Sequence, residues 1–138
     1  MTRLWHVDLL PYLPGKWLVS QFRECVGVTN QYYAGTINHA IVNRVRNYSE
    51  VDICTYNKLM LDAYDARGYK SNPEIREKLN AEKALNEKPF KGWHEDRYLA
   101  QCLFMLQEKY DVGMILEDDW KRIDEVPKFH AILESYDK

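Results

Sequence analysis

Residues 94–110 carry the most regular pattern in the chain, and this pattern constrains the fold more than any other feature. Large apolar side chains recur there every three or four positions, the spacing that places them on one face of an α-helix. That face consists of Leu99, Cys102, Leu103, Leu106 and Tyr110. Because such a face must be buried against other apolar elements, we expect His94 to Tyr110 to form an amphipathic helix that packs onto a core.

The same period appears three times in the N-terminal half, at about residues 15–26, 34–47 and 52–67. The residues expected to face the core are Leu18, Phe22 and Cys25 in the first helix, Ile37, Ile41 and Val45 in the second, and Ile53, Tyr56, Met60 and Ala63 or Tyr64 in the third. Pro14 lies at the start of the first helix, where a missing N–H costs little. Gly68 follows the third helix, at the position where a left-handed residue ends a helix.

The remaining segments complete a helical chain. Residues 71–84, which begin Ser-Asn-Pro, favour a charged helix, and residues 86–92 are typical of a loop. A shorter apolar and acidic stretch covers residues 114–123, and a last helical turn or two follows Pro127. No segment shows the sustained alternation of apolar and polar residues, with hairpin turns, that strands require. We therefore predict one all-α domain, a compact helical bundle over residues 1–138.

Composition and cysteine usage narrow the class of protein. Hydrophobic residues make up 46% of the chain and charged residues 29%, a balance typical of soluble globular proteins. No window approaches the roughly 18 consecutive apolar residues of a membrane helix. Asp8 also interrupts the N-terminus before a signal-peptide core can form. The three cysteines, Cys25, Cys54 and Cys102, cannot all pair within one chain, so we expect buried free thiols in a reducing cytoplasm.

Charge is distributed unevenly along the chain, although the net charge is only −2. Residues 1–50 carry five basic against three acidic side chains, and residues 51–100 carry nine of each. Residues 101–138 carry five basic against nine acidic side chains. The N-terminal third is therefore where we expect an anionic ligand to bind.

The common catalytic and metal-binding motifs are absent from the sequence. The six glycines are scattered, so there is no glycine-rich phosphate loop, and neither Gly-x-Ser-x-Gly nor His-Glu-x-x-His occurs. The four histidines lack the spacing of zinc ligands, and we expect no metal site. Cys25 falls on the apolar face of its helix, which favours a core thiol over a nucleophile.

The N-terminus and the first helix hold the remaining candidates for chemistry. Thr2 is small, so removal of Met1 is expected to leave Thr2 with a free α-amine, whose ordinary pKa of about 7.7–8.0 makes it partly neutral and nucleophilic. Such an amine can attack the C1′ carbon of a deoxyribose and form an imine. Glu24, beside Arg23 on the margin of the apolar face, can move protons near that amine. A glutamate on a helix is more often only a solvated charge.

Four short motifs, taken together in order and spacing, resemble the pyrimidine-dimer DNA glycosylase family, the phage-type endonuclease V enzymes. The resemblance covers about the first 75 residues. The motifs are Met1-Thr2-Arg3 with Phe22-Arg23-Glu24 about twenty residues later, Asn38-His39-Ala40-Ile41-Val42-Asn43, Tyr56-Asn57-Lys58-Leu59, and Ala66-Arg67-Gly68-Tyr69.

The resemblance implies a DNA repair activity on damaged double-stranded DNA, in a bacterium or a virus-infected cell. The family's nucleophile falls on Thr2, and the glutamate needed for base removal and strand cleavage falls on Glu24. Arg3 and Arg23 match positions that contact DNA near the lesion. The family fold is a compact all-α domain whose N-terminal segment threads between helices, and its reaction uses no metal or other cofactor. We also expect a monomer.

Further basic side chains are candidates for DNA phosphate contacts, and the departures from the family leave alternatives open. The additional DNA-binding candidates are Lys16, His39, Arg44 and Arg46. A solvated helix face is the alternative for Arg44 and Arg46, and a structural histidine is the alternative for His39. Gly27 replaces an arginine that the best-known members carry, and the C-terminal third is acidic where related enzymes are basic and rich in aromatic residues. Two further hypotheses are therefore a glycosylase for another damaged or modified base and a non-catalytic helical binding protein.

Overall fold

The computed structural model describes residues 3–35 and 40–135, and in these residues every regular element is a helix. The elements are the 3₁₀ helices η1 (Val7–Tyr12) and η2 (Ala81–Lys83) and the α-helices α1 (Gly15–Ala34), α2 (Ala40–Val45), α3 (Glu50–Ala66), α4 (Pro73–Lys78), α5 (Asp96–Asp111), α6 (Glu117–Asp124) and α7 (Pro127–Glu134). The all-α prediction is therefore confirmed. None of the described helices is long and apolar enough to span a bilayer.

Helix α1 is longer than the sequence pattern predicts, because Gly27 does not end it. A glycine inside a helix costs about 1 kcal/mol relative to alanine. That cost is small beside the burial of Val28 and Thr29 in the following turn. The helix ends at Gly35, whose φ of 72° lies in the left-handed region that glycine adopts without strain. The predicted second helix at 34–47 accordingly begins too early, since Ala34 still belongs to α1 and Gly35 ends that helix; α2 covers Ala40–Val45, and the predicted core residue Ile37 lies outside the described residues.

The third predicted helix corresponds closely to α3, whereas the fourth is interrupted. Gly68 follows α3 with a φ of 73°, as predicted for a residue that ends a helix. The charged helix predicted over residues 71–84 stops at Lys78, because Asn80 adopts a left-handed φ of 53°. Leu79 is buried at this break, and its carbonyl accepts a hydrogen bond of 3.0 Å from the buried Asn57 side chain of α3.

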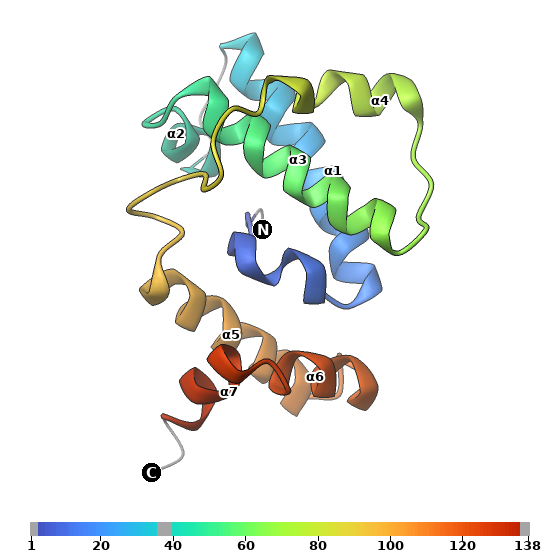
Figure 1. Ribbon diagram of the computed structural model, residues 1–138, viewed down its shortest axis with the longest axis vertical. Coiled ribbons are helices and arrows are strands. Elements are labelled where there is room, and N and C mark those ends of the chain that lie inside the picture. Colours follow the sequence, from blue (N-terminus) through green and yellow to red (C-terminus); the bar gives the residue numbers. More distant parts are fainter. Residues whose placement is uncertain (1–2, 36–39, 136–138) are drawn as a thin grey trace.

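The N-terminal segment lies between two groups of helices, with α1 to α4 on one side and α5 to α7 on the other (Figure 1). Trp5 N–H donates a 3.1 Å hydrogen bond to Gln21 Oε1 of α1. Tyr56 Oη of α3 donates a 2.6 Å bond to the Trp5 carbonyl, and Tyr98 Oη of α5 donates a bond of the same length to the Leu4 carbonyl. Three helices thus hold the backbone of two consecutive residues, which confirms the predicted threading.

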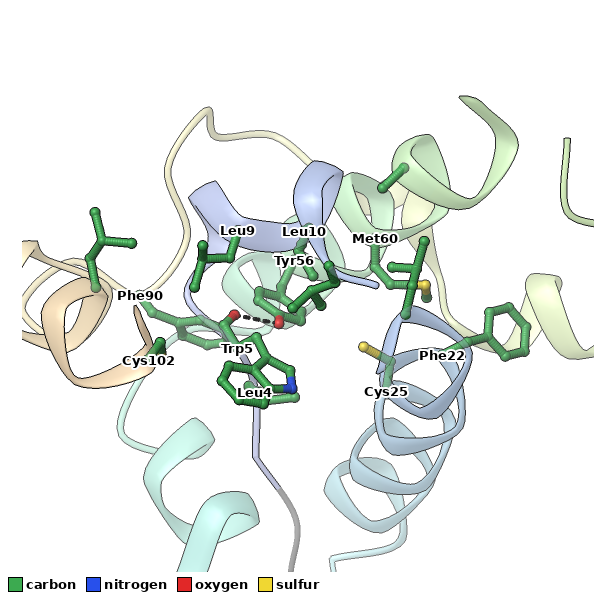
Figure 2. Packing of buried hydrophobic residues seen from close by; sticks show 14 of the residues in the cluster. Leu4, Trp5, Leu9, Leu10, Phe22, Cys25, Tyr56, Met60, Phe90 and Cys102 are labelled. Atoms are coloured by element: carbon green, nitrogen blue, oxygen red, sulfur yellow. Dashed lines mark hydrogen bonds between the residues drawn. The ribbon is translucent and has the colours of Figure 1, made fainter. Parts of the chain in front are cut away.

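The core surrounds this threaded segment. Figure 2 shows Leu4 and Trp5 between the side chains of α1, such as Cys25, and Cys102 of α5. Leu4, Leu9 and the residues predicted to face the core in α3 and α5 are buried, apart from the half-buried Tyr110. Each fully buried leucine contributes roughly 1.5–3 kcal/mol to folding, so the N-terminal segment is an integral part of the core. The three cysteines are free and buried, as predicted.

Candidate active site

A hollow of about 340 Å³ opens beside the threaded segment, between α1 and α5. Its lining comes from three parts of the chain: Arg3 and Trp5 from the N-terminal segment, Trp17, Ser20, Gln21 and Glu24 from α1, and Met105 and Lys109 from α5. We call this hollow the Glu24 pocket. It brings together Arg3 and Glu24, which are 21 positions apart in the sequence and were both predicted as site residues.

The α1 wall of the Glu24 pocket follows from the helical repeat. Trp17, Gln21 and Glu24 are spaced i, i+4 and i+7, so they share one face of the helix next to its core-facing stripe. Gln21 is buried and holds Trp5 through the hydrogen bond described above, whereas Glu24, one turn later, is half-buried. The helix therefore fixes the carboxylate relative to the N-terminal segment.

Cations surround the pocket and are held over aromatic rings. The Arg3 guanidinium lies 5.7 Å from the Trp5 ring centre and 5.9 Å from that of Tyr98. Lys109 Nζ lies 4.8 Å from the centre of the Trp17 ring, and Lys16 Nζ lies 5.0 Å from the same ring. Such contacts orient a cation without neutralising it, so the charges remain available to an anionic ligand.

The Trp17 indole also brings a hydrogen-bond donor to this wall. Its Nε1 is buried and has no hydrogen-bond partner among the described residues. A buried donor without an acceptor costs roughly 1–3 kcal/mol, and an ordered water, an ion or a ligand can supply the acceptor in such a case.

A second hollow, of about 240 Å³, lies near the N-terminal end of α5, and we call it the Trp93 pocket. It is lined by Arg44, Gly92, Trp93, Glu95, Arg97, Tyr98 and Gln101. The Arg44 guanidinium lies 4.4 Å from the Trp93 ring centre and so covers that buried indole. Because Arg3 lies over Tyr98, the two pockets meet at this pair of residues.

A third hollow, of about 530 Å³, contains none of the predicted site residues. It lies along the loop before α5, and its lining includes Asp52, Glu87, Lys88 and Lys91. Asp52 Oδ1 already accepts hydrogen bonds from the Asn86 side chain and from the Phe90 backbone N–H, so its carboxylate serves to hold the loop.

The predicted site residues fall into three groups in the structure. Arg3 and Glu24 line the Glu24 pocket, and Arg44 lines the Trp93 pocket. Lys16 does not line a pocket itself but lies over the ring of Trp17, which lines the Glu24 pocket. Arg23 is exposed on α1 and lines neither pocket, and Arg46 donates a 2.8 Å hydrogen bond to the Gln31 carbonyl. Thr2 and His39 lie outside the described residues.

Sequence reasoning missed the residues that α5 contributes. Arg97, Gln101, Met105 and Lys109 lie outside the core-facing stripe of the predicted 94–110 helix. Arg97 and Gln101 are exposed, whereas Met105 and Lys109 are half-buried at the margin of that stripe. The available signal was their regular spacing of four residues, which places them along one ridge of the helix.

Other reactive side chains of the fold have structural environments. Burial raises the pKa of the Cys25 thiol far above its usual range, so the thiol stays protonated and is a poor nucleophile. Burial, together with the nearby His6 and Arg44, lowers the pKa of His94 to about 3, and its ring is neutral at pH 7. The described residues contain no group of three or more histidine, cysteine or carboxylate side chains placed to hold a metal ion.

Comparison with protein families links this geometry to a known group. The model of the family described as pyrimidine dimer DNA glycosylase matches residues 2–77, more than half of the 138-residue chain. The matched segment includes Arg3 and Glu24 and ends before α5. Comparisons with curated proteins and with solved structures gave no match.

Proposed function

This chain belongs to the pyrimidine dimer DNA glycosylase family, and from that premise we propose that it excises damaged pyrimidines through the α-amine of Thr2 and then cleaves the strand as a lyase. Membership of the family makes DNA the substrate and repair glycosylase the class of activity. The finer proposal concerns which groups react, and in what order.

The observation that carries the proposal is the position of Arg3 in the Glu24 pocket. Thr2 directly precedes Arg3 in the chain. The backbone immediately after Arg3 is held at the Leu4 carbonyl and at both backbone polar groups of Trp5. An amine on Thr2 therefore lies one residue from a side chain that shares a pocket with the Glu24 carboxylate.

The proposed reaction begins when the neutral amine attacks C1′ of the damaged nucleotide. The bond from C1′ to the base breaks, and the base takes the electron pair and a proton. The sugar ring then opens at the C1′–O4′ bond, O4′ gains a proton, and the nitrogen forms an imine with C1′ as it loses its own protons. Glu24 acts as the acid–base group for these proton transfers.

Strand cleavage follows from the same imine. The protonated imine acidifies the C2′ proton, Glu24 removes that proton, and the electrons expel the phosphate from C3′ by β-elimination. Water then hydrolyses the imine and restores the amine. Arg3, Lys16 and Lys109 bind the phosphates beside the reacting sugar, while Arg44 binds farther along the DNA. Arg23 and Arg46, which line neither pocket, bind DNA outside the two pockets, and His39 remains a candidate for a phosphate contact.

Borohydride trapping tests the nucleophile directly. Reduction of the imine on a duplex with a thymine dimer or an abasic site is expected to give a covalent protein–DNA adduct. Acetylation of the N-terminal amine is expected to abolish that adduct, and an undiminished adduct would refute the role of Thr2. Mass analysis of the adduct locates the attached residue, and intact mass shows whether Met1 has been removed.

The Glu24→Gln variant tests the proton-transfer role. It is expected to bind the dimer duplex with an affinity close to that of the unsubstituted protein but to lose turnover by about 10²–10⁴-fold. Glu108→Gln, an exposed position on α5, is the matched control and should retain full activity. A fully active Glu24→Gln variant would remove the proposed role.

A different damaged or modified base is the second candidate substrate, and one observation favours it. The α5 wall of the Glu24 pocket, formed by Met105 and Lys109, lies outside the segment matched by the family. The part of the pocket wall that would contact the reacting nucleotide is therefore formed by residues that the family model does not include. Comparison of cleavage on irradiated and unirradiated duplexes separates the two candidates, because dimer specificity requires irradiation.

A further inference from the structure

A single ridge of α5 connects the two pockets. Arg97, Gln101, Met105 and Lys109 are spaced four residues apart, and in an α-helix such positions form a continuous row inclined to the axis. The first two line the Trp93 pocket and the last two line the Glu24 pocket. We call these four residues the α5 ridge. In Figure 1, α5 lies below the N-terminal segment.

The ridge carries a cation at each end, and each end faces a further cation from the family-matched part of the chain. Arg97 shares the Trp93 pocket with Arg44, and Lys109 shares the Trp17 ring with Lys16. Arg3 lies between the two ends, over Tyr98. The acidic side chain in the Trp93 pocket, Glu95, accepts a 3.2 Å hydrogen bond from the Gly92 backbone N–H and so is tied to its own loop.

The length of the ridge matches a short stretch of one DNA strand. Its end members are twelve positions apart, which corresponds to about 18 Å along an α-helix. One strand of B-DNA carries a phosphate about every 3.4 Å along the helix axis, so this length spans about five phosphates. Because Arg3 and the Glu24 pocket lie along this path, phosphates on both sides of the reacting nucleotide come within reach of the ridge.

We propose that the α5 ridge binds the backbone of the damaged strand, with Arg97 and Lys109 contacting phosphates on opposite sides of the lesion. The identity of the ligand as DNA rests on the proposed function, but the ridge itself lies outside the matched residues 2–77. Lys109 thus supplies a basic side chain within the acidic residues 101–138, and Arg97 lies shortly before them. Gln101 and Met105 occupy the interval between the two phosphate contacts.

The test is the salt dependence of DNA binding by the full chain. The probe is a duplex with a tetrahydrofuran abasic analogue, which has no C1′ hydroxyl and cannot form an imine. Each lost phosphate contact reduces the slope of log K against log salt concentration by about 1. The double variant Arg97→Gln and Lys109→Gln is expected to lower the slope by about 2 and to weaken binding at every salt concentration.

A matched control removes the same charge from another helix. Lys121 and Arg122 are exposed on α6 and line neither pocket, so the double variant Lys121→Gln and Arg122→Gln should keep the slope of the unsubstituted protein. Circular dichroism establishes that both double variants are folded. An Arg97/Lys109 variant with the control's slope and affinity would overturn the ridge proposal.

Borohydride trapping of the unsubstituted protein, run in parallel, separates this proposal from the catalytic one. A reduced slope in the ridge variant with no adduct from the unsubstituted protein supports the ridge and refutes the amine mechanism. An adduct together with an unchanged slope supports the amine mechanism and refutes the ridge. Absence of binding by the unsubstituted protein overturns both.

Discussion

Mild acid is expected to destabilise the fold through His94. The imidazole is buried between the N-terminal segment and α3, its Nδ1 accepts a 3.1 Å hydrogen bond from Val7 N–H, and its ring stacks on His6 with centroids 5.3 Å apart. Burial is the main reason why the pKa of His94 falls to about 3, with smaller contributions from His6 and Arg44. Protonation would place a charge inside the core and remove the acceptor from Val7.

The magnitude follows from proton linkage. Because the pKa of His94 is depressed in the folded protein, its stabilisation is fully present above the unfolded pKa of about 6.5. Below that pH the unfolded chain binds a proton that the folded chain does not, and stability falls by about 1.4 kcal/mol per pH unit. The expected loss is about 2 kcal/mol between pH 7 and pH 5, and it continues until pH 3. His6, whose pKa is also lowered mainly by burial, shifts stability in the same direction.

Urea unfolding at pH 7, 6 and 5 measures this loss. His94→Asn keeps an acceptor near Val7 but does not titrate. Between pH 7 and pH 5 this variant should therefore lose about 2 kcal/mol less stability than the unsubstituted protein. His130→Asn is the control, since His130 is exposed and its pKa is raised, mainly by the hydrogen bond to Asp124. A nuclear magnetic resonance titration of the unsubstituted protein covers the case in which His94→Asn fails to fold. Titration of His94 near pH 6.5, or a pH-independent free energy of unfolding, would refute the reasoning.

Two further predictions concern stability. Gly27→Ala should raise the free energy of unfolding by about 0.5–1 kcal/mol, because the position is inside α1 and nothing lies within 4 Å of the added Cβ. Gly35→Ala should lower the free energy of unfolding by about 1–2 kcal/mol, because φ is 72° there. Thermal unfolding compares the two variants, and equal effects would contradict the different roles of the two glycines. Tyr56→Phe should cost about 1–3 kcal/mol by leaving the buried Trp5 carbonyl without its donor, and urea unfolding measures this loss. A Tyr56→Phe variant as stable as the unsubstituted protein would show that the bond does not hold the N-terminal segment.

The helices that could be predicted are those whose local signals agree with their packing. Helix α3 has a regular apolar stripe and a glycine directly after it, and both features act within the segment itself. The end of α1 could not be predicted, since Gly27 is a residue that commonly ends a helix. The helix continues past it because Val28 is buried by tertiary packing, which the local sequence does not show. The break at Asn80 depends in the same way on Leu79, which is drawn into the core by α3.

The candidate site shows the same division. The proximity of Arg3 and Glu24 was expected from the family resemblance, and Trp17 and Gln21 share their helix face with Glu24 by simple periodicity. The contribution of α5 could not be predicted, because residues outside the core-facing stripe of a helix give no local signal of which other segment they contact. Only the packed structure shows that Lys109 lies across the pocket from α1 and that Arg97 shares a hollow with Arg44.

The hydrogen bond from Tyr98 to Leu4 joins residues 94 positions apart, and that from Val7 to His94 joins residues 87 apart. On the ribosome Leu4 and Val7 emerge first, whereas their partners Tyr98 and His94 are translated only in the second half of the chain. A nascent or truncated chain that stops before residue 94 therefore lacks both of these hydrogen-bond partners and the α5 wall of the Glu24 pocket. The Glu24 pocket can form only after most of the polypeptide has been made.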